Sequence, residues 1–197
     1  MSTVMNPALS TPESPRVSGR GRWQLIALLL VVIGPMILAT AMYQWRFWVP
    51  EGRTYHGSLI GDGTQLGDIG VQGATQARWQ LLVTSAGECA EDCRQLVYSA
   101  RQIHIGLNRD AARASHGLAL SRPLAADYAE QLRREYPQLG RYQLNDLKYG
   151  KAVPAGQGAQ LWIVDPQGNL VLRYDSGSRG KDILIDLRLL LKLSQIG

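Results

Sequence analysis

The chain has two cysteines, Cys89 and Cys93, within the segment SAGECAEDC at 85–93. Two thiols at this spacing can form a disulfide, exchange it with a partner, or offer two thiolates to a soft cation such as Cu(I). At the start of a helix, three intervening residues place the two sulfurs about one turn apart on the same face. The pair therefore predicts thiol–disulfide exchange, metal binding or a structural bridge, and the choice depends on the elements around it.

Charged residues surround the pair unevenly. Glu88, Glu91 and Asp92 lie beside the cysteines, and only Arg94 carries the opposite charge. Negative neighbours disfavour a thiolate and attract a cation. A strong thiol oxidant requires a stabilised thiolate, so this composition disfavours that class of protein.

Few other residues could complete a metal site. The four methionines all precede residue 43, which leaves His56, His104 and His116 as soft or borderline ligands after the apolar segment. His104 is expected about 16 Å from the cysteines along a helix, and His116 is expected within a strand. His56 is therefore the tentative third ligand beside Cys89 and Cys93.

The predicted elements place the cysteines between a strand and a helix. The apolar run at 78–85 is typical of a buried strand, and apolar residues at 89–107 recur with helical spacing. The amides and dipole at the start of such a helix would lower the pKa of a thiol there. Beyond it we expect a strand at 112–121, a helix at 124–136, a hairpin of strands at 159–164 and 169–176, and a helix at 181–196, with a β-leaning segment at 53–76 in front. This order is the plan of a thioredoxin-like α/β fold, βαβ–ββα with an N-terminal β extension.

An uncharged stretch of about 21 residues at 23–43 is long enough to cross a bilayer. It predicts one transmembrane anchor rather than a cleaved signal peptide, because LATAMYQW is a poor cleavage site. We expect a disordered cytoplasmic tail at 1–22, a juxtamembrane linker at 44–53 and the thioredoxin-like domain at 54–197. Arg16, Arg20 and Arg22 before the span narrowly outnumber Arg46 and Arg53 after it, which favours a domain outside the cytoplasm.

The formal net charge of +5 does not indicate nucleic-acid binding. The basic residues are scattered, and acidic residues interleave with them.

The chain resembles the Sco/SenC group, membrane-anchored thioredoxin-fold copper chaperones of cytochrome c oxidase assembly. The shared features are the anchor, Thr84 before a C-x-x-x-C pair, the passage LSRPLAADYAEQL, and the Asp-Pro-x-Gly hairpin at 165–168. The resemblance implies Cu(I) as cargo, an oxidase subunit or assembly factor as partner, and an inner-membrane protein whose C-terminal domain is periplasmic.

Two departures from that group separate this chain from its typical members. Arg94 replaces the proline that normally follows the second cysteine. The third copper ligand of the group, a histidine, corresponds to a position near Gln157, and no histidine follows His116.

These observations predict a protein that acts in oxidase assembly by copper handling or by thiol–disulfide exchange through Cys89 and Cys93. Cys89, nearer the helix start, would be the attacking thiol. One alternative is a non-catalytic assembly scaffold with a structural disulfide. Another is a general periplasmic thiol reductase, although such proteins usually carry C-x-x-C and a cis-proline, and the nearest proline here, Pro154, lies seven residues before Leu161.

Overall fold

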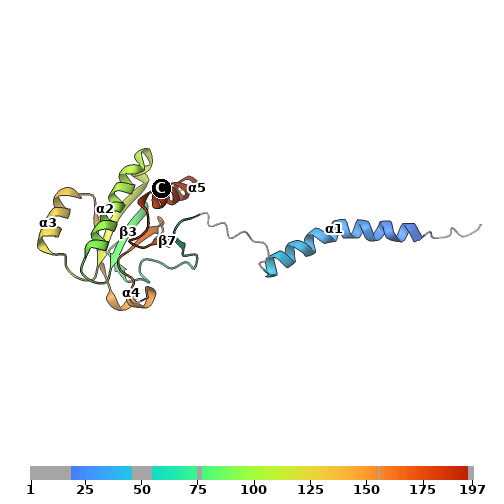
Figure 1. Cartoon of the computed structure of the whole chain (residues 1–197), viewed down its shortest axis with the longest axis horizontal. Coiled ribbons are helices and arrows are strands. Elements are labelled where there is room, and N and C mark those ends of the chain that lie inside the picture. The colour runs from blue at the N-terminus through green and yellow to red at the C-terminus, as the bar shows by residue number, and fades with distance from the viewer. Residues whose placement is uncertain (1–18, 46–54, 75–76, 155, 195–197) are drawn as a thin grey trace, which may run out of the picture. The chain divides into compact units, whose positions relative to one another are not determined.

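The computed structural model describes residues 19–45, 55–74, 77–154 and 156–194. The chain divides into two units, Met1–Gly52 and Arg53–Gly197. In the first unit, helix α1 (Gly19–Trp45) contains a 22-residue apolar stretch, Gly21–Met42, that is long enough to cross a membrane (Figure 1). The helix includes residues 19–22, which the sequence had placed in the tail. The rest of the predicted tail and residues 46–53 of the predicted linker lie outside the described residues.

The second unit is built on one mixed sheet of seven strands with the order β1-β7-β6-β3-β4-β5-β2. The central strand β3 runs parallel to β4 and antiparallel to β6, and all seven of its residues are buried. The strands are β1 (Ser58–Leu59), β2 (Val71–Gln72), β3 (Trp79–Ser85), β4 (Ala114–Leu120), β5 (Gly140–Leu144), β6 (Gln160–Val164) and β7 (Leu170–Tyr174).

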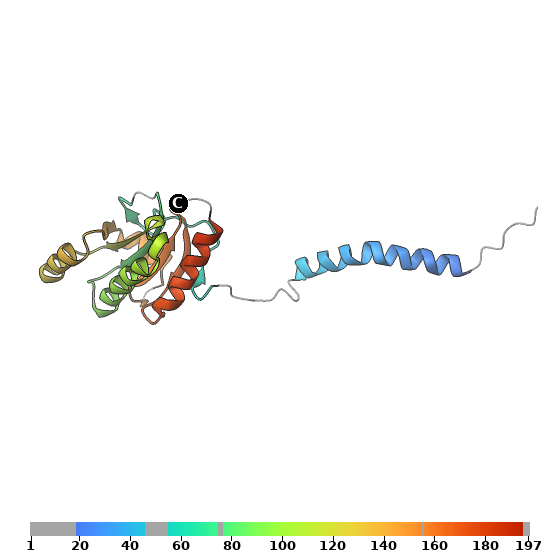
Figure 2. The ribbon, with the colours of Figure 1, turned by 90° about the horizontal axis from the view of Figure 1, so that it is seen from above.

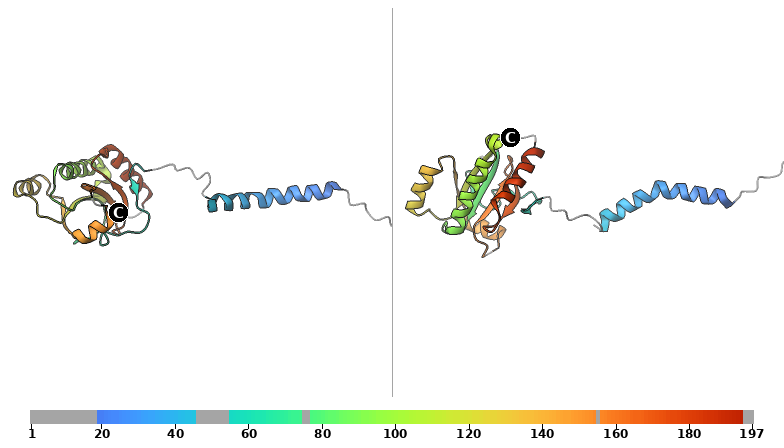
Figure 3. Two further views of the ribbon diagram at one scale, coloured as in Figure 1. Left: turned by 60° about the horizontal axis from the view of Figure 1, so that its bottom comes forward. Right: turned by 45° about the horizontal axis from the view of Figure 1, so that its top comes forward.

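Helices cover both faces of this sheet. Helices α2 (Glu91–Gly106) and α5 (Gly180–Leu193) lie side by side on one face, and α4 (Asp146–Ala152) lies on the other (Figures 2 and 3). The first core contains apolar residues of β3, α2 and α5. The second contains Leu82, Tyr149 and Trp162. The remaining elements are the 3-10 helix η1 (Asn108–Arg113) and helix α3 (Ala126–Glu135).

The thioredoxin-like fold predicted from the sequence is confirmed, with three elements added, one of them the short 3-10 helix η1. Strand β5 and helix α4 were also not predicted. The side chains of β5 alternate in burial and include Arg141 and Gln143, and α4 has only seven residues. Neither element therefore has the apolar run or the long helical period by which the others were recognised.

The β6–β7 hairpin forms where it was predicted. The Asp165 carboxylate accepts hydrogen bonds from the amides of Gln167 and Asn169 at 2.9 and 2.8 Å. Gly168 has φ +89°, a left-handed conformation that glycine adopts without a steric penalty. These contacts close the turn that joins β6 to β7.

Candidate redox site

The two cysteines lie between the end of the central strand β3 and the start of α2. Cys89 precedes the helix, Cys93 is its third residue, and the two form a disulfide with 5.1 Å between their Cα atoms. Their exposure differs, because Cys89 retains 8% of its surface and Cys93 retains none. The structure thus brings the predicted pair together at the edge of the first core, where both residues are buried and Cys89 is the less buried of the two.

Contacts from two sides hold this segment in place. The carboxylate of Asp92 accepts a hydrogen bond of 2.9 Å from the amide of Ala159, just before β6. Arg94 donates its Nε–H to the carbonyl oxygen of Cys89 at 3.3 Å, and its guanidinium lies 4.6 Å from the centre of the Tyr128 ring. Asp92 and Arg94, whose contacts were not predicted from the sequence, are therefore positioning residues for the disulfide.

A buried hydrogen-bond network fixes the end of β3 below the cysteines. The indole Nε1–H of Trp162 donates to Thr84 Oγ1 at 2.8 Å, and the hydroxyls of Thr84 and Tyr149 lie 2.8 Å apart. The three side chains come from β6, β3 and α4. A buried network with its partners satisfied is rigid, so the strand that leads to Cys89 has a defined end.

The electrostatic environment combines opposing effects. The start of α2 has no side-chain cap, and Glu91 and Asp92 occupy its first turn, where negative charge is favourable to the helix dipole. Carboxylates so close to a sulfur disfavour a second negative charge. Burial also raises the pKa of Tyr128 to about 12, so its phenol stays neutral beside Arg94. The carboxylates and the burial of the sulfurs therefore oppose the helix start, whose amides and dipole favour a thiolate.

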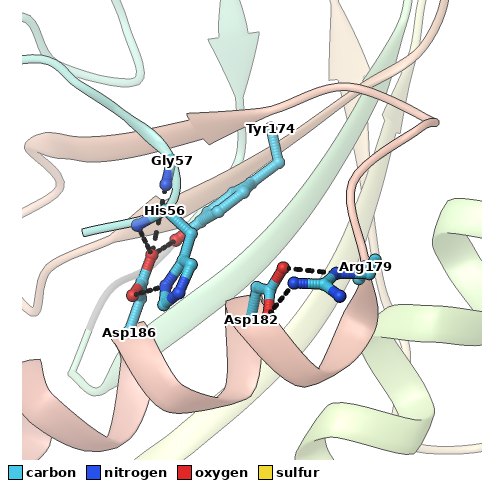
Figure 4. Close-up of polar contacts among 6 residues, drawn as sticks. All are labelled: His56, Gly57, Tyr174, Arg179, Asp182 and Asp186. Atoms are coloured by element: carbon cyan, nitrogen blue, oxygen red, sulfur yellow. Dashed lines mark hydrogen bonds and ion pairs between the residues drawn. The ribbon is translucent and has the colours of Figure 1, made fainter. Parts of the chain in front are cut away.

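The tentative third ligand, His56, is bound elsewhere (Figure 4). Its Nδ1 lies 2.8 Å from the carboxylate of Asp186 on α5, which is fully buried. The same carboxylate accepts hydrogen bonds from the amides of His56 and Gly57 and from the hydroxyl of Tyr174, at 2.7, 3.2 and 2.7 Å. The hydrogen bond to Asp186 raises the pKa of His56, and burial is the main cause of a raised pKa at Tyr174.

His56 and the cysteines lie at the same end of the sheet without meeting. His56 lines a cavity of about 410 Å³ together with Gln157 and Ala159, from the loop that bonds to Asp92. In the sheet, two strands separate β1, which follows His56, from β3. Among the described residues, no three or more His, Cys, Asp and Glu side chains group in a way that could hold a metal ion. The structure therefore does not bring His56 to the sulfurs, and its role as a ligand stays a prediction.

The other two histidines lie together away from the cysteines. The rings of His104 and His116 are 5.0 Å apart, and His104 Nε2 lies 3.1 Å from the carbonyl oxygens of Ala111 and Ala114. Burial, followed by the charges of His104 and Arg101, lowers the pKa of His116 to about 4. His116 is therefore a neutral core residue, as its position in a strand predicted.

We expect the stability of the protein to fall between pH 6.5 and pH 4 because of His116. Its pKa is lower in the folded state than in the unfolded chain, so the unfolded chain binds the extra proton throughout this range. The stabilisation is complete above pH 6.5 and is lost as the pH falls through the folded pKa. Chemical unfolding of the wild type and of His116→Gln at pH 4.5, 5.5 and 7.5 would measure it. The free-energy difference between the two should shrink toward low pH, and a constant difference would contradict the assignment.

Asp186 is the polar residue that the sequence analysis missed. It is one member of the buried set Ile183, Asp186, Leu187 and Leu190 on α5. A carboxylate at a core position of an amphipathic helix needs hydrogen-bond partners inside the protein. The position of Asp186 among the apolar residues of this helix could have indicated a buried carboxylate. It does not identify the distant residues that donate hydrogen bonds to it.

Comparisons with solved structures return several proteins of low sequence identity. Copper-bound ScoI of Arabidopsis thaliana has 8% identity and a TM-score of 0.48, and the match covers 61% of this chain and 88% of that one. Copper-bound yeast Sco1 has 13% identity and a TM-score of 0.47, with 61% and 83% covered. A putative thiol:disulfide interchange protein DsbE from Chlorobium tepidum has 12% identity and a TM-score of 0.43, with 61% and 83% covered. No curated protein sequence matches the chain.

Family models match both units. The model described as transmembrane-like, N-terminal domain matches residues 15–46, and the apolar helix α1 agrees with a single-pass membrane protein. The model described as transmembrane-like, thioredoxin-like, C-terminal domain matches residues 79–194, more than half of the chain and the part that contains the cysteines. The chain therefore belongs to the transmembrane-like, thioredoxin-like family.

Proposed function

We propose that this protein is a membrane-anchored thiol–disulfide exchange protein that reduces a disulfide of a partner. The observation that carries the proposal is the unequal exposure of two bonded sulfurs at the start of a helix, 8% for Cys89 and none for Cys93. Cys89, which keeps a small accessible surface, can be reached by a partner, and the fully buried Cys93 can complete the exchange without competing for it.

The exchange runs in two steps. In the reduced protein, the Cys89 thiolate attacks one sulfur of the partner disulfide, which forms a mixed disulfide and releases one partner thiolate. The Cys93 thiolate then attacks Cys89 Sγ, which forms the Cys89–Cys93 bond and releases the second partner thiolate. Two electrons pass to the partner, and a dithiol donor must later return the pair to the reduced state.

The direction follows from the environment of the sulfurs. A couple becomes a strong oxidant when its reduced form is stabilised as a thiolate. Here Glu91, Asp92 and the burial of Cys93 act against a thiolate. The disulfide is therefore favoured, and the reduced pair gives up electrons readily.

Copper handling, the other predicted activity, fits the described residues less well. Two reduced thiolates one turn apart are suitable donors for Cu(I). His56, the tentative third donor, is bonded to Asp186, and Gln157 lines the cavity before β6. No step of the proposed function passes through copper.

The cellular context is a proposal drawn from the Sco/SenC resemblance. We place the protein in the inner membrane with the second unit in the periplasm, in line with the basic residues that precede the uncharged stretch at 23–43. The partner would be a cytochrome c oxidase subunit or assembly factor whose cysteines must be reduced before they bind metal.

A scaffold with a structural disulfide is the second candidate, and the burial of both cysteines in the first core favours it. The two candidates differ in redox potential. Full-length protein in detergent would be equilibrated with glutathione and dithiothreitol buffers, and its free thiols would be alkylated and counted.

We expect half-reduction between about −180 and −270 mV, the range from protein disulfide isomerase to thioredoxin. A bridge still oxidised below about −300 mV would support the scaffold and contradict the proposal. Anaerobic Cu(I) titration of the reduced chain beside its Cys89→Ser/Cys93→Ser double variant tests copper handling, because equal weak binding by both would exclude it.

A further inference from the structure

The outer surface of α5 carries basic and apolar side chains in one row. Lys181, Ile185, Arg188 and Lys192, here named the α5 stripe, are all exposed and follow one another at intervals of three or four residues. Residues at these intervals share one face of a helix. Ile185 is 43% exposed, and Leu193 beside the end of the stripe is 67% exposed.

The acidic residues of α5 do not neutralise the stripe. Asp182 forms an ion pair of 2.8 Å with Arg179, and its side chain is 17% exposed. Asp186 is fully buried and bonded to His56, Gly57 and Tyr174. The face is therefore positively charged along the whole length of the helix.

The surface continues onto α2. Arg188 donates a hydrogen bond of 2.7 Å to the carbonyl oxygen of Gly106, and the side chain of Leu184 packs against the same glycine. Ile105, next to Gly106, is 53% exposed. An exposed apolar side chain of α2 thus lies one residue from the point where α2 contacts α5.

The chain that leads from α1 enters the second unit at this helix. The amides of His56 and Gly57 both donate to Asp186 of α5. Only nine residues, 46–54, separate α1 from Tyr55. A tether this short keeps the unit at a high local concentration near any membrane that α1 crosses.

We propose that the α5 stripe, with Ile105 and Leu193, binds the surface of an anionic lipid bilayer. Lys and Arg side chains on a helix attract anionic headgroups, and aliphatic side chains beside them enter the boundary between headgroups and acyl chains. A protein partner would require an acidic surface that matches the stripe. A bilayer needs no such partner, because α1 already attaches the chain to one. This binding does not depend on the chemistry of the cysteines.

The positions of the lysines provide the test. The chain has four lysines, Lys181 and Lys192 on α5 and Lys148 and Lys151 on α4, which lies on the opposite face of the sheet. Full-length protein would be placed in nanodiscs of phosphatidylcholine alone or with about 30% phosphatidylglycerol, and amine acetylation would be followed by mass spectrometry. We expect Lys181 and Lys192 to react about fivefold more slowly in the anionic discs, with Lys148 and Lys151 unchanged.

A matched pair of variants compares the α5 stripe with the opposite face of the sheet. Ile185→Glu should abolish the protection of Lys181 and Lys192, whereas Leu147→Glu, at a residue of α4 that is 81% exposed, should leave it intact. Salt at about 0.5 M should also reduce the protection. Equal reaction of all four lysines in both discs would overturn the proposal, and so would protection that survives Ile185→Glu.

Discussion

Replacing Asp186 by alanine is expected to destabilise the second unit by about 3 kcal/mol. The carboxylate accepts four hydrogen bonds, from the amides of His56 and Gly57, the His56 ring and the Tyr174 hydroxyl. Without it, the buried hydroxyl and the two amides lose their acceptor, and each unsatisfied donor costs about 1 to 3 kcal/mol when water cannot reach it. Thermal unfolding of the full-length protein should show a melting temperature lower by roughly 10 °C.

Asp182→Ala is the matched control, one turn earlier on the same helix. Its ion pair with Arg179 is exposed on the arginine side, where the side chain is 80% accessible. Exposed pairs of this kind contribute less than about 1 kcal/mol, so the melting temperature should change by only a few degrees. An equal decrease in melting temperature in the two variants would show that the hydrogen bonds of Asp186 do not hold the start of the second unit to α5.

The same cluster predicts a pH dependence opposite in sign to that of His116. The pKa of His56 is raised by its hydrogen bond to Asp186, so the folded protein binds the proton more tightly than the unfolded chain. This stabilisation is complete below pH 6.5 and is lost as the pH rises through the folded pKa of His56. In Asp186→Ala this dependence should be absent.

The parts of the structure predicted from sequence were those with a local signal. The strand at 78–85, the helix after the cysteines and the hairpin at 165–168 each have a distinctive pattern within a few residues. The disulfide is also a local contact, since its residues are four apart.

What the sequence did not show depends on contacts between distant segments. The bond from Ala159 to Asp92 joins residues 67 apart, and that from His56 to Asp186 joins residues 130 apart. Which donor reaches a buried carboxylate is decided by the packing of whole elements. His56 was accordingly considered for the cysteine site because of its residue type, although the fold binds it to α5.

Cys89→Ser and Cys93→Ser should fail in different ways if the pair exchanges disulfides. With Cys89 replaced, only the fully buried Cys93 remains, so the reduced protein should attack a model disulfide peptide at least about a hundredfold more slowly than the wild type. With Cys93 replaced, Cys89 can still attack the peptide, but no second thiol is present to break the mixed disulfide that forms. The mixed disulfide between Cys89 and the peptide should therefore accumulate and be visible by non-reducing mass spectrometry.

Each variant is the stability control for the other, because both lack the same bridge. Closing so small a loop stabilises a protein by about 2 kcal/mol in the chain-entropy model, so the two melting temperatures should fall together while the kinetic results diverge. A structural disulfide would give the same modest loss of stability in both variants and no mixed disulfide in either. If Cys89→Ser instead reacted at the wild-type rate, the attacking thiol would be Cys93, and the proposed order of the two steps would be wrong.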